Sequence, residues 1–264
     1  PNQTIYNIRN IPINISTSEI VDKIVYLDSF DKKPKEKKLC DNCNEFGLTR
    51  KKSFNLDDGK HNLTFKAIKS GINVSNITNI FIDSDEPNIK KTTPKRNGYS
   101  NGSFIIEYKE DNVKQIILNY GDNLFGKSDC SFNSEDRTQI CEFNVDLSEF
   151  NNKTLTYSFE IEDIAGNRDA SKRIEINVDT ISPNITKLNY TIDKRRVEFD
   201  IEISEKADLE YYDLNNTRSR WNTLCNNCDN YKKGKSFTKG GHSLIIRATD
   251  NAQNVDEGAI NLII

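Results

Sequence analysis

The sequence predicts an all-β protein made of three β-sandwich domains in a linear array. Two observations predict this fold class. Apolar and polar residues alternate in many short runs, and a strand–turn–strand–linker pattern recurs three times along the 264 residues. Alternation at a period of two is typical of half-buried antiparallel strands. We expect at most one helical turn, over residues 146–150.

The clearest copy of this pattern spans Leu155–Ile185. Apolar residues alternate over 155–161 and again over 174–178, and between them lies Asp163–Asn167, which reads Asp-Ile-Ala-Gly-Asn. Gly and Asn tolerate the backbone angles of a tight turn. Pro183 follows the second run, and proline ends a sheet because it has no N–H to donate. The stretch therefore predicts the closing hairpin of a sandwich, followed by a linker.

Similar hairpins recur in the first and last thirds of the chain. His61–Ala67 leads to Ile80–Asp83, and His242–Asn254 leads to Ile260–Ile264. The Pro-Asn-Ile sequences that begin at residues 87 and 183 are 183 − 87 = 96 residues apart, which matches one sandwich of roughly 100 residues. We therefore predict three domains, at residues 1–85, 86–181 and 182–264.

The turn and the linker together resemble the tandem immunoglobulin-like repeats of prokaryotic cell-surface proteins, including archaeal surface-layer proteins. The resemblance rests on Asp163–Asn167 with Asp179–Pro183, and more loosely on Asp250–Asn254, whereas Lys69–Asn73 departs from the motif. It implies an Ig-like, fibronectin-III-like sandwich for each domain. It does not specify a function, because such modules serve as spacers, array subunits, adhesins and sugar binders alike.

Composition excludes several classes of protein. The chain has 37 Lys and Arg against 40 Asp and Glu, a net charge of −3, which argues against a nucleic-acid partner. No apolar run approaches the roughly 20 residues of a membrane span, so we expect neither membrane insertion nor a signal peptide within these limits. The absence of Met and the start at Pro1 favour a processed or excised segment of a longer protein.

Six cysteines fall two to each predicted domain. A zinc site usually needs two Cys pairs close together, but the two Cys-x-x-Cys pairs are 225 − 40 = 185 residues apart. A redox dithiol would sit in a βαβ setting, which the strand pattern lacks. The favoured interpretation is one local disulfide per domain, a clip on a loop, pairing Cys40–Cys43, Cys130–Cys141 and Cys225–Cys228. Disulfides persist outside the reducing cytosol, so they predict an extracellular location.

Asn-x-Ser/Thr sequons give a second, independent indication of location. Their number predicts covalent N-glycans on an extracellular, cell-surface protein. The candidate acceptors are Asn2, Asn14, Asn62, Asn73, Asn76, Asn101, Asn152, Asn184, Asn189 and Asn215.

No catalytic residues are predicted, and we do not expect this segment to be an enzyme. His61 and His242 occupy corresponding positions in two repeats, which favours packing or turn elements over a catalytic base. Trp221 is the only tryptophan. It could stack on a sugar, although a partly buried packing residue is favoured.

Calcium is the one cofactor that the residues suggest, as an alternative to no cofactor at all. Hard cations take six to eight oxygen ligands, and carboxylates gather near the linkers, although Asp and Asn are also common in ordinary turns. The candidate ligands are Asp83, Asp85, Asp163, Asp169 and Asp179.

Together these observations predict a structural segment of a glycosylated extracellular protein. Its expected partners are copies of itself, assembled in a surface layer or filament. The alternative is an adhesin or carbohydrate-binding stalk, which would attach to a foreign glycan or surface protein.

Overall fold

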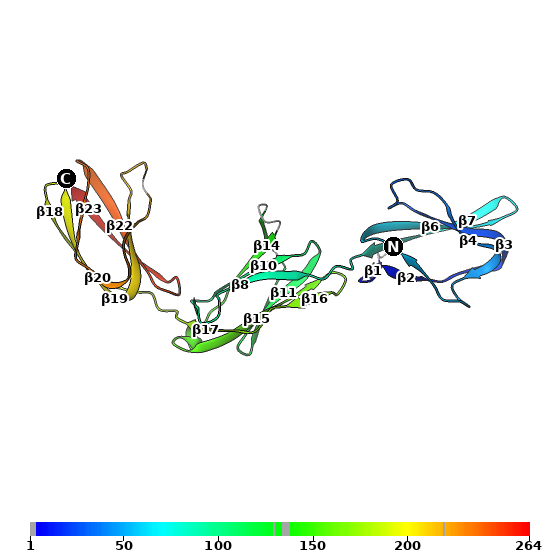
Figure 1. The fold of residues 1–264 in the computed structure, drawn as a ribbon, viewed down its shortest axis with the longest axis horizontal. Helices are drawn as coiled ribbons and strands as arrows, with labels where there is room; N and C mark the ends of the chain where they lie inside the picture. The colour runs from blue at the N-terminus through cyan, green and yellow to red at the C-terminus, as the bar shows by residue number, and fades with distance from the viewer. Residues whose placement is uncertain (1–3, 129, 134–137, 219) are drawn as a thin grey trace.

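The computed structural model is an extended row of three β-sandwich domains (Figure 1). It describes residues 4–128, 130–133, 138–218 and 220–264. We call the unit of β1–β7 domain 1, that of β8–β17 domain 2 and that of β18–β23 domain 3. The predicted all-β linear array is confirmed. No helix in the described residues is long and apolar enough to cross a membrane.

Domain 1 begins the row and has two sheets of unequal size. Its strands are β1 (Thr4–Tyr6), β2 (Asn10–Ile13), β3 (Ile15–Asp28), β4 (Lys37–Phe46), β5 (Lys52–Asn55), β6 (Gly59–Lys69) and β7 (Ile72–Ile82). The larger sheet has the order β1-β7-β6-β3-β4, and the smaller sheet consists of β2 and β5. The β6–β7 hairpin is the first copy of the closing hairpin.

Domain 2 is the most complete sandwich. Its elements are β8 (Asn88–Thr93), β9 (Tyr99–Ser100), β10 (Ser103–Lys109), β11 (Val113–Tyr120), β12 (Asn123–Lys127), β13 (Ser131–Asn133), β14 (Thr138–Asn144), the 3-10 turn η1 (Ser148–Phe150), β15 (Thr154–Asp163), β16 (Arg168–Ala170) and β17 (Ile174–Val178). The sheets have the orders β13-β14-β10-β8 and β12-β11-β15-β17-β9, and β16 pairs with β15. The single helical turn expected over 146–150 is the 3-10 turn.

Domain 3 differs because one long strand runs through both layers. Its strands are β18 (Ile185–Asp193), β19 (Arg196–Asp213), β20 (Asn222–Tyr231), β21 (Gly234–Ser236), β22 (Gly241–Thr249) and β23 (Val255–Ile263). The first half of β19 pairs with β18 and β21, and its second half pairs with β22. The closing hairpin is β22–β23.

Each domain has its own buried apolar cluster, supplied by the inward-facing residues of alternating strands. Val197, Phe199 and Ile201 are at most 2 % exposed, as the alternation in the sequence requires. The clusters fall within residues 11–82, 104–178 and 197–262. Between them run the linkers from Ile82 to Asn88 and from Val178 to Ile185. The predicted limits of 85 and 181 lie within these linkers.

Candidate functional site: the domain junctions

The Asp-x-Ala-Gly-Asn turn of domain 2 is held together by its own aspartate. Oδ1 of Asp163 accepts hydrogen bonds from the backbone N–H groups of Ala165 and Asn167, both at 2.8 Å. Oδ2 accepts a hydrogen bond from Nδ2 of Asn167 at 2.7 Å. Gly166 has a φ of 89°, a left-handed conformation that glycine adopts without strain. The short polar side chains therefore fix both the turn and the orientation of the Asn167 amide.

That amide also binds the linker that enters domain 2. Nδ2 of Asn167 donates to the backbone carbonyl of Asp83 at 2.8 Å and to that of Asp85 at 3.2 Å. Asp169, just beyond the turn, accepts the N–H of Ile89 through Oδ2 at 2.8 Å. The turn thus holds the linker on one side and the first strand of the domain on the other. We call this arrangement the linker clamp.

A second linker clamp forms at the next junction, from the looser copy of the motif. Oδ1 of Asp250 accepts the N–H groups of Ala252 and Asn254 at 2.8 Å, and Oδ2 accepts Nδ2 of Asn254 at 2.8 Å. Nδ2 of Asn254 donates to the carbonyls of Asp179 and Ile181, at 2.9 and 3.3 Å. The two junctions therefore have the same geometry, although Gln253 replaces the glycine, also with a positive φ of 70°.

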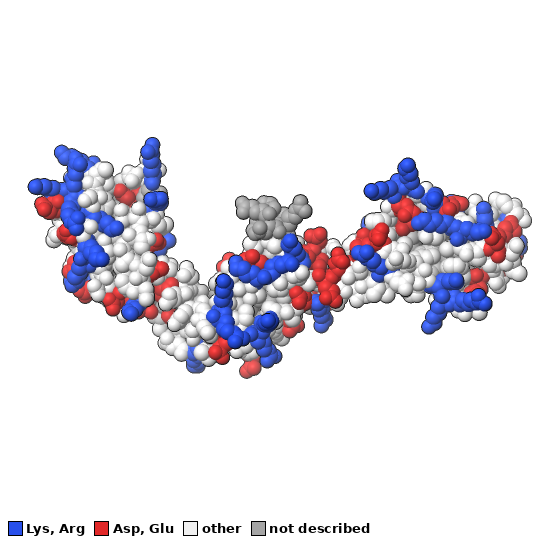
Figure 2. All heavy atoms as spheres, in the orientation of Figure 1, with Lys and Arg blue, Asp and Glu red and all other residues white. Residues whose placement is uncertain are grey.

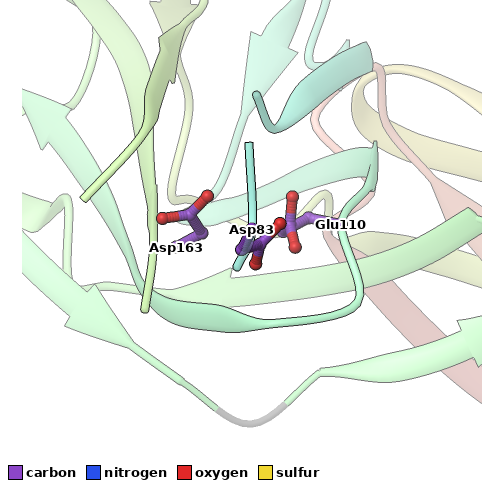
Figure 3. Close-up of side chains that lie close together, drawn as sticks. All are labelled: Asp83, Glu110 and Asp163. Atoms are coloured by element: carbon purple, nitrogen blue, oxygen red, sulfur yellow. The ribbon is translucent and has the colours of Figure 1, made fainter. Parts of the chain in front are cut away.

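Three carboxylates meet beside each clamp. Asp83 of the first linker, Glu110 of the β10–β11 loop and Asp163 each offer an oxygen within 4.8 Å of the others (Figure 3). The corresponding set at the second junction is Asp179, Glu205 and Asp250. We call these sets the acidic triads.

Three carboxyl groups of the triads, those of Asp83, Glu110 and Glu205, have raised pKa values. Burial raises the pKa of Asp83, the carboxylate of Asp163 raises it further, and a hydrogen bond from Asn112 acts against both effects. Burial is also the main cause of the raised pKa of Glu110. At the second junction, burial and the other two carboxylates of the triad raise the pKa of Glu205.

Asp83 and Glu110 of the first triad line an open cleft of about 970 Å³ between domains 1 and 2. Acidic side chains gather at the junction of domains 1 and 2 in Figure 2. The cleft is lined from domain 1 by Asp58 and Phe81, from the linker by Asp83 and Glu86, and from domain 2 by Asn112. Carboxylate oxygens are the ligands that hard cations prefer, and a cation at either triad would meet three of the six to eight oxygens that calcium takes.

The structure brings together only some of the predicted calcium ligands. Asp83 and Asp163 share the first triad, and Asp179 belongs to the second. Asp85 and Asp169 lie outside both triads; Asp85 is exposed, and Oδ2 of Asp169 accepts the N–H of Ile89. Sequence reasoning missed Glu110, Glu205 and Asp250. Asp250 could have been found, because it occupies the place of Asp163 in the looser copy of the motif.

The two histidines are buried and paired with aspartates, in positions that correspond between domains 1 and 3. Nδ1 of His242 lies 2.6 Å from Oδ2 of Asp213, and Nε2 lies 3.0 Å from the carbonyl oxygen of Thr238. His61 lies 2.7 Å from Asp28 in the same way. Burial alone would lower the pKa of His242, but its bond to Asp213, its bond to the carbonyl and the nearby negative charge raise it.

The structure contains the three predicted disulfides, but two of them are not loop clips. Cys40–Cys43 lies inside β4 and Cys225–Cys228 inside β20, each at a break in the register with the neighbouring strand. Asn42 and Asn227 have φ values of 45° and 48°, which Asn tolerates better than most residues. The Cys225–Cys228 bond therefore spans a shift in the pairing of β20 with β19, whereas Cys40–Cys43 lies between two shifts in the pairing of β4 with β3.

Trp221 does not present a free stacking face. The guanidinium of Arg247 lies 3.8 Å from the centre of its ring, and the ring of Tyr212 packs against it at 5.4 Å. The predicted packing role accounts for these contacts.

Most of the predicted glycan acceptors are exposed. Asn62 and Asn101 are half-buried, and Nδ2 of Asn62 donates to Asn79 at 2.9 Å, while Asn2 lies outside the described residues. The exposed acceptors are Asn14, Asn73, Asn76, Asn152, Asn184, Asn189 and Asn215.

Neither family models nor curated proteins match the chain. Among solved structures it is similar to the FN1–FN3 domains of chicken CNTN1, with 11 % identity over 97 % of this chain and 95 % of that one and a TM-score of 0.44. A tetra-tandem repeat in the extending region of a large adhesion protein has 12 % identity over 99 % and 72 %, with a TM-score of 0.38. An I-band fragment of titin has 13 % identity over 98 % and 93 %, with a TM-score of 0.39. At these identities the similarity concerns the fold alone.

Proposed function

We propose that this chain is a structural segment of an extracellular protein, a semi-rigid spacer that holds its neighbours at a fixed distance. The observation that carries this proposal is the repetition of the linker clamp. Asn167 and Asn254 each donate two hydrogen bonds to the backbone of the preceding linker. Flexible linkers would allow domain motion by default, whereas a linker bonded to the next domain has few conformations.

The extracellular location is part of the same proposal. Three disulfides suit an oxidising compartment. Exposed sequons in all three domains, such as those of Asn14, Asn152 and Asn215, would carry N-glycans. Copies of the glycosylated rod would associate side by side in a cell-surface layer or filament, as repeated interfaces between identical subunits allow.

Small-angle scattering tests the spacer. The double variant Asn167→Ala/Asn254→Ala removes both clamps, and Asn144→Ala, an exposed position in β14, serves as the matched control. We expect the wild type and the control to scatter as one extended particle. The double variant should give a broader distribution of interatomic distances. Identical curves for all three proteins would contradict the proposed role of the clamps.

Sedimentation velocity and electron microscopy test the association. Glycosylated protein should form ordered assemblies with a constant repeat as its concentration rises. A monomer under every condition tried would contradict the proposed association in a layer or filament. It would not contradict the proposed role as a spacer.

A further inference from the structure

In the part of the chain that the structure describes, domain 1 has an unpaired strand edge. In domains 2 and 3 an additional strand covers the corresponding edge. In the described residues β2 pairs only with β5, whereas its counterpart β10 lies between β14 and β8. In domain 3 the first half of β19 lies between β21 and β18. These strands correspond because three backbone carbonyls accept equivalent hydrogen bonds. The carbonyls of Arg9, Gly102 and Arg195 accept the N–H groups of the residues that directly follow β5, β14 and β21, which are Leu56, Val145 and Phe237.

The covering strand also completes the core. Ile89 of β8 packs against the buried cluster of domain 2, and Ile185 and Leu188 of β18 pack against that of domain 3. Of the described residues, six form the buried cluster of domain 1, against fourteen in each of the others. Domain 1 therefore lacks apolar contacts at the place where β8 and β18 supply them.

An apolar groove lies at this place. It measures about 530 Å³ and runs between the edge of β2 and the facing side of β7. Its lining includes Ile11, Ile13, Ile24, Leu63, Val74 and Ile80. Val74 is 72 % exposed and its neighbour Ile72 is 73 % exposed, so β7 presents apolar side chains that nothing in the described chain covers.

We propose that this groove binds an extended β-strand of the same polypeptide, supplied from the N-terminal side of Pro1. The strand would pair antiparallel with β2, as β8 pairs with β10 and β18 with β19. Apolar side chains at alternate positions would enter the groove in the manner of Ile89.

The register determines where this strand would lie in the chain. β1 pairs parallel with the end of β7, as β9 pairs with the end of β17. Tyr6 corresponds to Ser100, because their carbonyls accept the N–H groups of Asp83 and Asp179, at 2.9 and 3.1 Å. β8 ends 100 − 93 = 7 residues before Ser100. The equivalent strand therefore ends seven residues before Tyr6, upstream of Pro1.

The backbone of β2 is suited to such a partner. In an antiparallel pair, residues alternate between bonding their partner and facing the opposite edge. The carbonyl of Arg9 bonds Leu56 on the side of β5. Every second residue from Arg9 therefore bonds β5, and the N–H groups of Asn10 and Asn14 face the groove on the opposite edge. Pro12 faces it too but has no N–H. The added strand would thus lack one ladder bond that β8 makes, a feature common at edges.

A graft tests the proposal. Residues 86–94 are placed directly before Pro1 in the whole chain, which sets the copy of β8 in the register described above. Hydrogen exchange of the Asn14 amide should slow by at least about tenfold, since exchange reports local opening of paired strands. The thermal transition of domain 1 should shift upward. The matched control is the same graft with Ile89→Asp in the grafted copy only, which should show neither change.

Three outcomes would overturn the proposal. The Asn14 amide could be as protected in the ungrafted chain as the Glu107 amide of β10, so that no free edge exists. The graft could leave Asn14 unprotected while the Ile11 amide remains protected, which shows that β2 and β5 are folded. Protection could also appear in the ungrafted chain as its concentration rises, together with a dimer in sedimentation, so that a second copy fills the groove.

Discussion

His242 and Asp213 link the stability of domain 3 to pH through a single buried contact. The raised pKa of His242 means that the folded state holds its proton more tightly than the unfolded state. The resulting stabilisation is fully present below the unfolded value of about 6.5 and is lost as pH rises through the folded value. Calorimetry should therefore show the transition of domain 3 weakening as pH rises above about 6.5.

The variant His242→Leu isolates this effect. It should remove the loss on raising pH, because leucine has no proton to release. Domain 2 provides an internal comparison: Tyr120 pairs with Tyr157 as Asp213 pairs with Leu244, and Leu155 and His242 lie two residues before those partners. A wild-type domain 3 whose stability changes with pH no differently from that of the variant would contradict the assignment.

At the scale of elements, the alternating pattern predicts strands well and their pairing less well. Val197, Phe199 and Ile201 are buried as the pattern requires. The same pattern does not show that β19 continues from one layer into the other, because period-two alternation is the same on either side of a bend. The sequence likewise predicts that Cys40–Cys43 and Cys225–Cys228 lie in loops, because an irregularity inside a strand has no periodic signature.

The disulfides should stabilise their domains according to the loops they close. On chain entropy alone, removal costs about 2 kcal/mol for a four-residue loop and about 3 kcal/mol for a twelve-residue loop. The pair Cys225→Ala/Cys228→Ala should therefore lower the unfolding free energy of domain 3 less than Cys130→Ala/Cys141→Ala lowers that of domain 2. Chemical denaturation of the two variants measures the difference. A larger loss for the four-residue loop would show that the bond chiefly holds the bulge of β20 in place.

At the scale of the whole molecule, the sequence predicts the order of the domains and part of each junction. The turn Asp163–Asn167 is recognisable, yet its role as a linker clamp depends on where the preceding linker passes. Glu110 and Glu205 join the triads from a loop and from the middle of a strand. Nothing in the local sequence distinguishes them from the other Asp and Glu residues, because only the folded chain brings them beside Asp83 and Asp179.

The acidic triads should make the junctions less stable at neutral pH than at mildly acidic pH. Because the folded pKa values of Asp83 and Glu110 are raised, their charged forms destabilise the folded junction above those values. This penalty disappears as pH falls below the unfolded values of about 4. In metal-free buffer at pH 7, Asp83→Asn should therefore raise the melting temperature and reduce the gain on acidification. Asn keeps the shape of Asp and removes its charge.

Asp122→Asn is the matched control for this variant, since Asp122 is exposed and lies outside both triads. It should leave the melting temperature unchanged, because a single solvated charge contributes little. A lower melting temperature for Asp83→Asn would mean that Asp83 stabilises the junction through its charge. If that reversal appeared only after calcium chloride was added, the positive charge would come from a cation held by the three carboxylates. At the second junction, burial and then the carboxylate of Asp179 raise the pKa of Glu205, so Asp179→Asn should also raise the melting temperature in metal-free buffer.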